Sequence, residues 1–447
     1  MKFCSIQAGK RFGVLLIALT PSLLFAQSEK TLLDSSQYQL HFQQTIIAQY
    51  KPSMPAKYSG KNSLSAAEES QTSLTATFFT GLKMGKKTWL YFNPEIAGGS
   101  GLSSALGVAG FPNGETFRIG NPKPQVYIAR FYVDHFFAFG SEREENENGI
   151  NQQQVRVPLK YLRLVAGKYS VADFFDCNSY SHDPRMQFMN WSLMSNGAWD
   201  YPANTRGYTW GVLTELRLNQ LYIRAGAHLV PETANGSKLD NRLPEALAAT
   251  TEIQKIYRIS GRRGALRMLL FLNHANMGNY KQAVDETMPD SIPNLVATRS
   301  HGRVKFGFGL NWEQEISENA GLFARLSWND GKNETWAFTE IDRSISVGYL
   351  LNFTLLGRPN DELGIACVVN GISTEHQNFL KRGGTGFMLG DGTLRYGPET
   401  IGEIFYNLDL HNQHFWLSPG YQFILHPGYN QDRGPAHVFS IRVHTEF

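Results

Sequence analysis

Apolar and polar side chains alternate along much of this chain, most clearly in its last twelve residues, 436–447. One face of an extended segment there carries Phe439, Ile441, Val443 and Phe447. The other face carries Ser440, Arg442, His444 and Glu446. An edge strand of a soluble sheet alternates in the same way, but so does a strand with lipid on one side and water on the other. The terminal aromatic Phe447 favours the second interpretation, because the machinery that assembles outer-membrane barrels recognises such an end.

Similar segments of about ten residues recur along the chain, separated by turns. We predict sixteen strands, over residues 38–50, 71–83, 88–97, 125–138, 160–170, 207–218, 220–230, 251–262, 264–275, 302–316, 321–331, 336–353, 361–372, 398–411, 414–425 and 436–447. An even strand number is typical of bacterial outer-membrane barrels. No linker-like change in composition interrupts the series. The predicted fold class is therefore all-β, a single 16-stranded antiparallel transmembrane β-barrel over residues 27–447.

The connections between these strands alternate between tight turns and long polar stretches. The short ones include Gly85-Lys86-Lys87, Asn219 and Arg262-Arg263. Short turns belong to the periplasmic end of such a barrel and long loops to the outside. Residues 139–159 break this rule, since a long segment stands where a turn is expected. Its acidic run, 142–147, is more typical of a solvated loop than of a cation site.

Charge indicates which face of each strand points inward, because an arginine or lysine at the bilayer midplane costs roughly 2–4 kcal/mol but stays solvated in a wet lumen. On 125–138 this places Arg130 and Asp134 inside and Tyr127, Ala129, Phe131 and Val133 outside. On the later strands it places Arg224, His228, Arg303, Lys305, Asn311, Glu313, Arg325 and Asn329 inside. The inner wall is thus predicted to be charged and the outer wall apolar.

The first 26 residues have the form of a secretory signal peptide. Lys2, Lys10 and Arg11 precede an apolar run over 12–25 that ends at the small residue Ala26. The run is short for a membrane helix and contains Pro21. No later stretch reaches 18 uninterrupted apolar residues, and the mean hydropathy of −0.30 suits a barrel in which alternate side chains face water. We therefore predict export to the outer membrane of a Gram-negative bacterium.

Charge and cysteine content exclude some classes of protein. Lys and Arg number 42 against 39 Asp and Glu, and the predicted signal peptide holds three of the basic residues and no acidic one. A neutral mature chain does not suit a nucleic-acid-binding protein. Cys177 and Cys367 remain after the signal. Because Cys367 shares a face with Ile365 and Val369, we interpret it as a small lipid-facing residue and expect no disulfide.

Four blocks of sequence resemble the carbohydrate-selective porin family, the OprB-type outer-membrane porins. They are GKYSVADFFDCNSYSHDPRMQFMNWSLMSNGAWDYPANTRGYTWG (167–211), YFNPEIAGG (91–99), FPNGE (111–115) and PGYNQDRGPAHVFSIRVHTEF (427–447). They span most of the mature chain in the matching order. The resemblance implies passive, selective diffusion of mono- and oligosaccharides through a sixteen-stranded barrel that is often trimeric. Expected partners are therefore these sugars, outer-membrane lipid and lipopolysaccharide, and the barrel assembly machinery through Phe447.

Residues 171–206 are the first place to look for a sugar site. This third external connection is too rich in aromatic residues and Met for a solvated tip, so we predict that it folds inward and narrows the pore. Planar donors, carboxylates and aromatic rings suit sugars. The candidate residues are Arg130, Asp134, Arg163, Asp183, Arg185, Trp191, Trp199, Asp200 and Arg206. Arg224, Arg325 and Arg442 are a reserve set.

A structural interpretation of the same loop residues stays open. Trp191, Trp199 and Phe188 would then form a small core that holds the loop, and Arg185 would pair with Asp183 inside it. The alternative functions are a general diffusion porin, a porin for acidic solutes, and more remotely a barrel hydrolase. Ser181-His182-Asp183 carries little weight for hydrolysis, because side chains of successive residues usually diverge and a catalytic triad must meet in space. We expect no metal and no cofactor.

Overall fold

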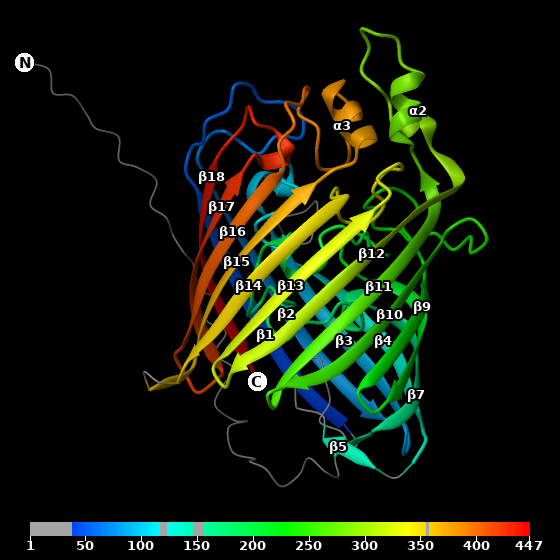
Figure 1. Ribbon diagram of the computed structural model, residues 1–447, viewed down its shortest axis with the longest axis vertical. Coiled ribbons are helices and arrows are strands. Elements are labelled where there is room, and N and C mark those ends of the chain that lie inside the picture. The colour runs from blue at the N-terminus through cyan, green and yellow to red at the C-terminus, as the bar shows by residue number, and fades with distance from the viewer. Residues whose placement is uncertain (1–37, 117–122, 141, 146–155, 355–356) are drawn as a thin grey trace, which may run out of the picture. The chain divides into compact units, whose positions relative to one another are not determined.

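The computed structural model describes residues 38–116, 123–140, 142–145, 156–354 and 357–447. Over these residues the chain forms a closed barrel of sixteen strands (Figure 1). Each strand pairs antiparallel with its neighbours, and the barrel closes where β1 pairs with β18. The backbone N–H of Phe447 also donates to the carbonyl of Phe42 at 2.9 Å. The predicted signal peptide, residues 1–26, lies outside the described residues.

The barrel strands follow the predicted order along the chain. They are β1 (Tyr38–Lys51), β2 (Glu69–Lys83), β3 (Thr88–Gly99), β4 (Gln125–Ala138), β7 (Lys160–Tyr169), β8 (Thr209–Leu218), β9 (Leu221–His228), β10 (Leu247–Ile259), β11 (Arg262–Met277), β12 (Ser300–Ser317), β13 (Ala320–Asn329), β14 (Arg343–Phe353), β15 (Arg358–Gly371), β16 (Glu399–Asp409), β17 (Phe415–Leu425) and β18 (Ala436–Glu446). The prediction of a sixteen-stranded antiparallel barrel is confirmed.

The helices are short and lie in the connections. They are η1 (Leu102–Ala105), η2 (Val171–Asp173), α1 (Trp191–Met194), α2 (Tyr280–Asp285), η3 (Val296–Thr298), α3 (Thr374–Lys381) and η5 (Pro427–Tyr429). In the described part of the chain, no helix has the length and apolar character needed to cross a membrane. Helices α2 and α3 contact each other at the end of the barrel where the long loops gather (Figure 1).

The predicted faces are confirmed on most strands. On β12, Lys305 and Glu313 are buried whereas Phe306 is 48% exposed. On β18, Ser440, Arg442 and His444 are buried, while Phe439 and Ile441 face outward. The charged residues named on these two strands therefore point inward, as the cost of a charge in lipid requires.

The outward faces predicted for Tyr127 and Ala129 are wrong, and Ala129 is fully buried. Asn93 of β3 pairs with Arg130, but Pro94 pairs with Ile128, so β4 holds one extra residue, Ala129, at a β-bulge. Such a bulge changes which alternate side chains point inward. Tyr127 therefore faces the lumen, where its hydroxyl donates to a carboxylate oxygen of Glu95.

Three predicted boundaries are also wrong. The strand predicted over 336–353 begins only at Arg343, because residues 336–342 fold against another loop. Arg262 and Arg263 belong to β11, and the turn before them is at Ser260 and Gly261, both with positive φ. The exceptional connection 139–159 contains a small two-stranded ribbon, β5 (Arg143–Glu145) paired with β6 (Arg156–Pro158). Part of the acidic run 142–147 lies outside the described residues.

Both cysteines in the described part of the chain are free. Cys367 is exposed on the outer face of β15, as the alternation of that strand predicts, and Cys177 is half-buried in the connection after β7. A bond between them is therefore absent.

An aromatic core lies in the connections. The Trp191 ring stacks on Phe111 at 5.0 Å between centroids and lies 5.1 Å from Phe338. Tyr201 is 5.2 Å from Trp199 and also contacts Phe338 at 5.1 Å. Three connections, around residues 111, 200 and 338, thus share one core.

Candidate functional site

The connection between β7 and β8, residues 170–208, is called the 170–208 loop below. Its backbone is ordered by its own side chains. Asp173 accepts a hydrogen bond from the Ser170 N–H at 3.2 Å and completes the capping box of η2. Asn190 caps α1 by accepting from the Ser192 N–H at 3.1 Å. Together with the aromatic core, these caps give a long loop a defined shape.

Inward-facing side chains of the wall hold this loop. Glu403 of β16 accepts hydrogen bonds from the backbone N–H groups of Met189 and Asn190, at 2.7 and 2.9 Å. Arg325 of β13 lies 3.2 Å from a carboxylate oxygen of Asp176, and both side chains are almost fully buried. Arg442 of β18 donates to the Gln187 carbonyl at 2.7 Å. The loop is therefore bound to separate parts of the wall.

Five acidic and basic residues alternate on consecutive strands of the wall, and we call them the charged ladder. They are Asp134 (β4), Arg163 (β7), Glu215 (β8), Arg224 (β9) and Glu252 (β10). Arg163 is directly opposite Glu215, and Arg224 is directly opposite both Glu215 and Glu252. Opposite positions of an antiparallel pair bring side chains together. The register of the strands therefore builds the ladder.

Each ladder arginine contacts two carboxylates. Arg163 donates two hydrogen bonds to Asp134, at 2.9 and 2.7 Å, and its Nη1 lies 3.8 Å from Glu215. Arg224 donates to Glu215 and, at 2.6 Å, to Glu252. Fork-shaped guanidinium groups suit this arrangement. The charges are nearly balanced within the ladder, so it offers donors and acceptors together.

Arg130 joins the wall to the 170–208 loop. Its Nε and Nη2 donate to the two carboxylate oxygens of Asp173, at 2.7 and 2.6 Å. The guanidinium also lies over the Tyr208 ring, 5.5 Å from its centroid. The predicted candidate Arg130 is thus brought to the loop, whereas Asp134 pairs with Arg163.

Arg185 does not pair with Asp183 as the structural interpretation supposed. Its guanidinium donates to Glu115 at 2.8 Å and to Glu95 at 3.1 Å, while Asp183 accepts only the Arg185 backbone N–H, at 2.9 Å. Arg185 is buried between the loop and the inner face of β3. A buried guanidinium needs more than one acceptor, and the distant carboxylates meet that need better than its own neighbour.

The remaining candidates lie in the loop core or at its edge. Trp191 and Trp199 are each 1% exposed. The buried carboxylate of Asp200 accepts hydrogen bonds from the N–H groups of residues 336, 337 and 338, at 2.8, 2.9 and 3.1 Å. Arg206 donates to Gln125 at 2.6 Å and lies 4.1 Å from the Tyr127 ring centroid. The structure thus brings Asp134 and Arg163 together, pairs Arg130 with Asp173, and puts Trp191, Trp199 and Asp200 elsewhere.

The candidate charged side chains differ in the fraction that is exposed to solvent. The side chains of Arg163 and Asp173 are 21% and 24% exposed, whereas those of Arg130 and Asp134 are 9% and 1% exposed. In each pair one partner is buried and the other reaches solvent. Arg163 and Asp173 are therefore the more exposed members of the two ion pairs.

Sequence reasoning missed Glu95, Glu115 and Asp173 as parts of this site. A signal for them existed, because Glu95 lies in YFNPEIAGG, Glu115 ends FPNGE and Asp173 lies in the longest block that resembles the porin family. What no pattern indicated is that Arg185, far along the chain, meets the first two. That contact depends on how the loop folds.

A second polar cluster ties the outer connections together. Asp200 and Gly197 of the 170–208 loop bond residues 336–339, and Glu340 next to them accepts hydrogen bonds from the Met388 and Leu389 N–H groups, at 3.0 and 2.7 Å. Burial raises the pKa of Glu340 to about 7. Burial also acts to raise the pKa of Asp342, but a hydrogen bond with His376, 3.2 Å away, and the charges of His376 and Lys305 lower it to about 2.

Hydrolysis gains no support from the Ser181-His182-Asp183 triplet. The Ser181 hydroxyl donates to the Leu193 carbonyl at 2.7 Å. Among the described residues, this hydroxyl makes no hydrogen bond to His182. In the same part of the chain, no group of three or more His, Cys, Asp or Glu residues is arranged to hold a metal ion.

Comparisons with known proteins agree with the barrel. The family model described as carbohydrate-selective porin, OprB family, matches residues 61–447. OprB of Pseudomonas putida in its high-pH structure is 15% identical, covering 93% of this chain and 95% of that one, with a TM-score of 0.68. Its low-pH structure is 10% identical, over 93% and 94%, with a TM-score of 0.51. No curated protein matches.

The outer-membrane channel DcaP of Acinetobacter baumannii is also similar. It is 11% identical, covers 92% of this chain and 97% of that one, and has a TM-score of 0.50. At these identities the structural likeness supports the fold, while the match over residues 61–447 shows the family. The chain belongs to the carbohydrate-selective porin family, OprB type, and is an outer-membrane carbohydrate porin of Gram-negative bacteria.

Proposed function

We propose that sugars pass between the charged ladder and the 170–208 loop, and that Arg163 and Asp173 contact them. The observation that carries this proposal is the one-sided exposure of the two ion pairs, since each exposed member is held by a buried partner. A guanidinium donates and a carboxylate accepts, so together they complement sugar hydroxyl groups. Both charges are already paired, which keeps binding weak enough for release.

Two buried aromatic rings lie beside these charges. The Arg163 guanidinium is 5.2 Å from the Phe174 ring centroid, and Phe174 contacts Tyr132 at 5.9 Å. Phe174 is itself only 7% exposed, so its proposed role, like that of Trp191 and Trp199, is support: its ring packs against the Arg163 guanidinium that contacts the sugar.

The 170–208 loop is the proposed constriction. Its support is the set of wall contacts through Arg130, Arg325, Glu403 and Arg442, which hold the loop backbone at separate points of the wall. Trp191, Trp199 and Asp200 then act on the pore indirectly, as the core that keeps the loop in shape. Arg185 fastens the middle of the same loop, and Arg206 fastens its C-terminal end.

Single-channel conductance of the refolded protein, with neutral mono- and oligosaccharides titrated against the ion current, tests this proposal. Saturable block is expected. Arg130→Ala releases Asp173 and is expected to raise the conductance or weaken the block, whereas Arg258→Ala, which removes an exposed charge near the β10–β11 turn, is expected to change neither. Equal behaviour of both variants and the wild type would exclude Arg130 and Asp173 from the constriction. Open channels that sugars do not block would indicate general diffusion or passage of acidic solutes.

Three further points stay predictions. We propose that residues 1–26 are the export signal of a single barrel domain and that the barrel forms a homotrimer. Contact of Phe447 with the assembly machinery is the third. Native mass spectrometry of the detergent-purified protein measures the oligomeric state, and N-terminal sequencing of the mature protein measures the cleavage site.

A further inference from the structure

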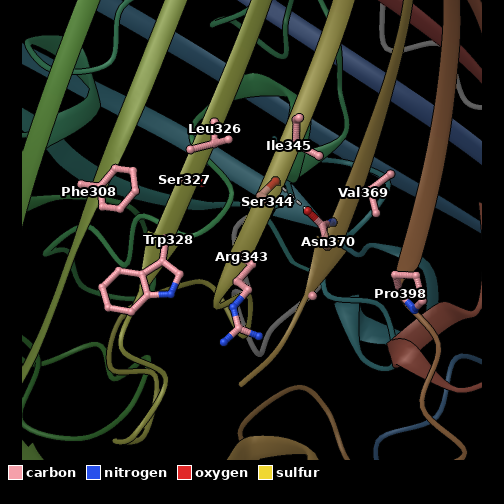
Figure 2. A pocket seen from close by; sticks show the side chains of 11 residues that line it. Phe308, Leu326, Ser327, Trp328, Arg343, Ser344, Ile345, Val369, Asn370 and Pro398 are labelled. Carbon is pink, nitrogen blue, oxygen red and sulfur yellow. Dashed lines mark hydrogen bonds between the residues drawn. The ribbon is translucent and has the colours of Figure 1, made fainter. Parts of the chain in front are cut away.

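An apolar groove of about 680 Å³ lies on the outer face of the barrel, at the ends of β13, β14 and β15 that meet the long loops (Figure 2). Its apolar lining is Phe308, Leu326, Trp328, Ile345, Val369 and Pro398. Trp328, Arg343 and Gly371 lie directly opposite one another on the three strands. The groove therefore ends where these strands meet the long connections.

Glycine keeps this end of the groove open. A Cβ added at Gly371 would lie 3.1 Å from the Tyr396 hydroxyl and 3.9 Å from the Arg343 Cβ. The tyrosine hydroxyl and the arginine therefore flank the same glycine, and the space between them has no side chain from β15. Next to it, the Ser344 hydroxyl donates a hydrogen bond to the Asn370 side-chain oxygen at 2.8 Å (Figure 2). These two polar side chains are thus paired with each other.

Arg343 is the single charged residue of the groove lining. Its side chain is exposed, and the described residues provide it with one long hydrogen bond, from Nη1 to the Ile372 carbonyl at 3.4 Å, and with no carboxylate at ion-pair distance. On the inner face, by contrast, Arg267 pairs with Glu313 and Arg325 pairs with Asp176. A guanidinium on a lipid-facing surface is unfavourable unless an anion or water reaches it.

We propose that this groove binds one acyl chain of an outer-leaflet glycolipid, whose phosphate pairs with Arg343. The chemistry of the two parts matches such a lipid: an apolar trough along the strands and a planar cation at the headgroup level, able to hold a phosphate through two hydrogen bonds. The Tyr396 hydroxyl is a further donor beside it. A second copy of the barrel would present an apolar outer wall, which leaves Arg343 without an anion.

Binding of diphosphorylated lipid A to the full-length protein in detergent tests this inference. Native mass spectrometry measures the bound fraction over a lipid titration, and the same glycolipid without phosphates is the chemical control. Arg343→Gln is expected to weaken binding of the phosphorylated lipid about tenfold or more and to leave the weak binding of the dephosphorylated lipid unchanged. Arg258→Gln, with the same loss of charge near a periplasmic turn, is expected to bind as the wild type does.

Ile345→Trp is the second variant. It fills the groove while keeping the Arg343 guanidinium and, because Ile345 faces outward, leaves the inner wall as it is. It is expected to weaken binding of both lipids. Equal affinity of the wild type for both lipids, or no effect of Arg343→Gln, would contradict the inference. A change of oligomeric state in these variants with lipid binding intact would instead make the groove a contact between copies. The inference is independent of the proposed sugar passage, since sugar block is expected to be normal in both variants.

Discussion

Two parts of the inner wall differ in the size and charge of their side chains. The charged ladder on β4 and β7–β10 consists of long side chains that pair across strands. We call the inward positions of 344–350 on β14 and of 364–370 on β15 the neutral wall, made of Ser344, Ser346, Gly348, Leu350, Gly364, Ala366, Val368 and Asn370. The charged ladder presents hydrogen-bonding groups toward the lumen. The small side chains of the neutral wall leave space for other parts of the chain.

The neutral wall uses its glycines to receive the 170–208 loop. A Cβ at Gly348 would lie 2.2 Å from the Phe323 ring, and one at Gly364 would lie 2.2 Å from the Phe405 ring, so both rings lie flat against neighbouring strands. Phe188 of the loop packs on these rings, at 5.6 and 5.0 Å between centroids. The comparison indicates that small residues dock the loop on one side, so that the charges opposite can serve the solute.

The largest effect is expected from Arg325→Ala, on the strand between the two regions. This change leaves the buried Asp176 carboxylate without its ion pair and removes donors to the Leu193 and Ser181 carbonyls. Breaking a buried pair from one side costs about 3–5 kcal/mol. Thermal unfolding is expected at lower temperature, with noisier and larger single-channel currents. Ser346→Ala on the neutral wall is the control, and similar unfolding of the two variants would show that Arg325 does not hold the loop.

The next largest effect is expected from Gly364→Val. The added side chain overlaps the Phe405 ring, and overpacking of this kind costs about 1–3 kcal/mol. Displacement of Phe405 also displaces Phe188, so channel noise is expected to increase as stability falls. Gly402→Val is the matched control, since a Cβ there meets no atom within 4 Å. Equal melting of the two glycine variants would contradict docking of the loop on the neutral wall.

A functional effect without a large loss of stability is expected from the double variant Arg163→Gln, Asp134→Asn. Removing both partners avoids an unpaired buried carboxylate. The sugar concentration for half-block is expected to rise about tenfold, equivalent to ~1.4 kcal/mol. Arg262→Gln changes a half-exposed residue at the start of β11. Its sugar concentration for half-block is expected to equal that of the wild type. A double variant with unchanged block would remove Arg163 from the sugar site.

The smallest effect is a pH dependence of the outer connections. Glu340 holds its proton in the folded protein up to about pH 7, compared with 4.5 ordinarily, so its contribution to local stability falls as the pH rises from about 4.5 to 7. Asp342, lowered from 3.8 to about 2, contributes stability above pH 3.8 that is lost as the pH falls through 2. Hydrogen exchange of the α3 amides, corrected for the intrinsic rate, measures both.

Two glutamate variants separate these contributions. Glu340→Gln is expected to remove the change in hydrogen-exchange protection of the α3 amides between pH 4.5 and 7. The loss of protection at lower pH, which is assigned to Asp342, is expected to stay unchanged. Glu286→Gln, at the exposed end of α2, is expected to leave the wild-type profile intact. A slope that survives in Glu340→Gln would mean that another group titrates there.

The alternation of side chains by itself determined the barrel, its strand order and most of the inner face. That information is local, because each strand repeats with period two and a misplaced arginine or lysine costs free energy in lipid. The acidic and basic types needed for a sugar passage were visible in the same way at Arg130, Asp134 and Arg163. The blocks that resemble the porin family supplied the substrate class.

Only the tertiary structure decided which of those residues meet. The bulge at Ala129 turned Tyr127 inward, and the fold of the 170–208 loop carried Arg185 to Glu95 and Glu115 and buried Trp191 and Trp199. Residues 336–342 left the strand predicted for them because the Asp200 carboxylate is satisfied by their N–H groups. These contacts form because buried polar groups need hydrogen-bond partners. The partners lie far along the chain, so the local alternation of side chains does not predict them.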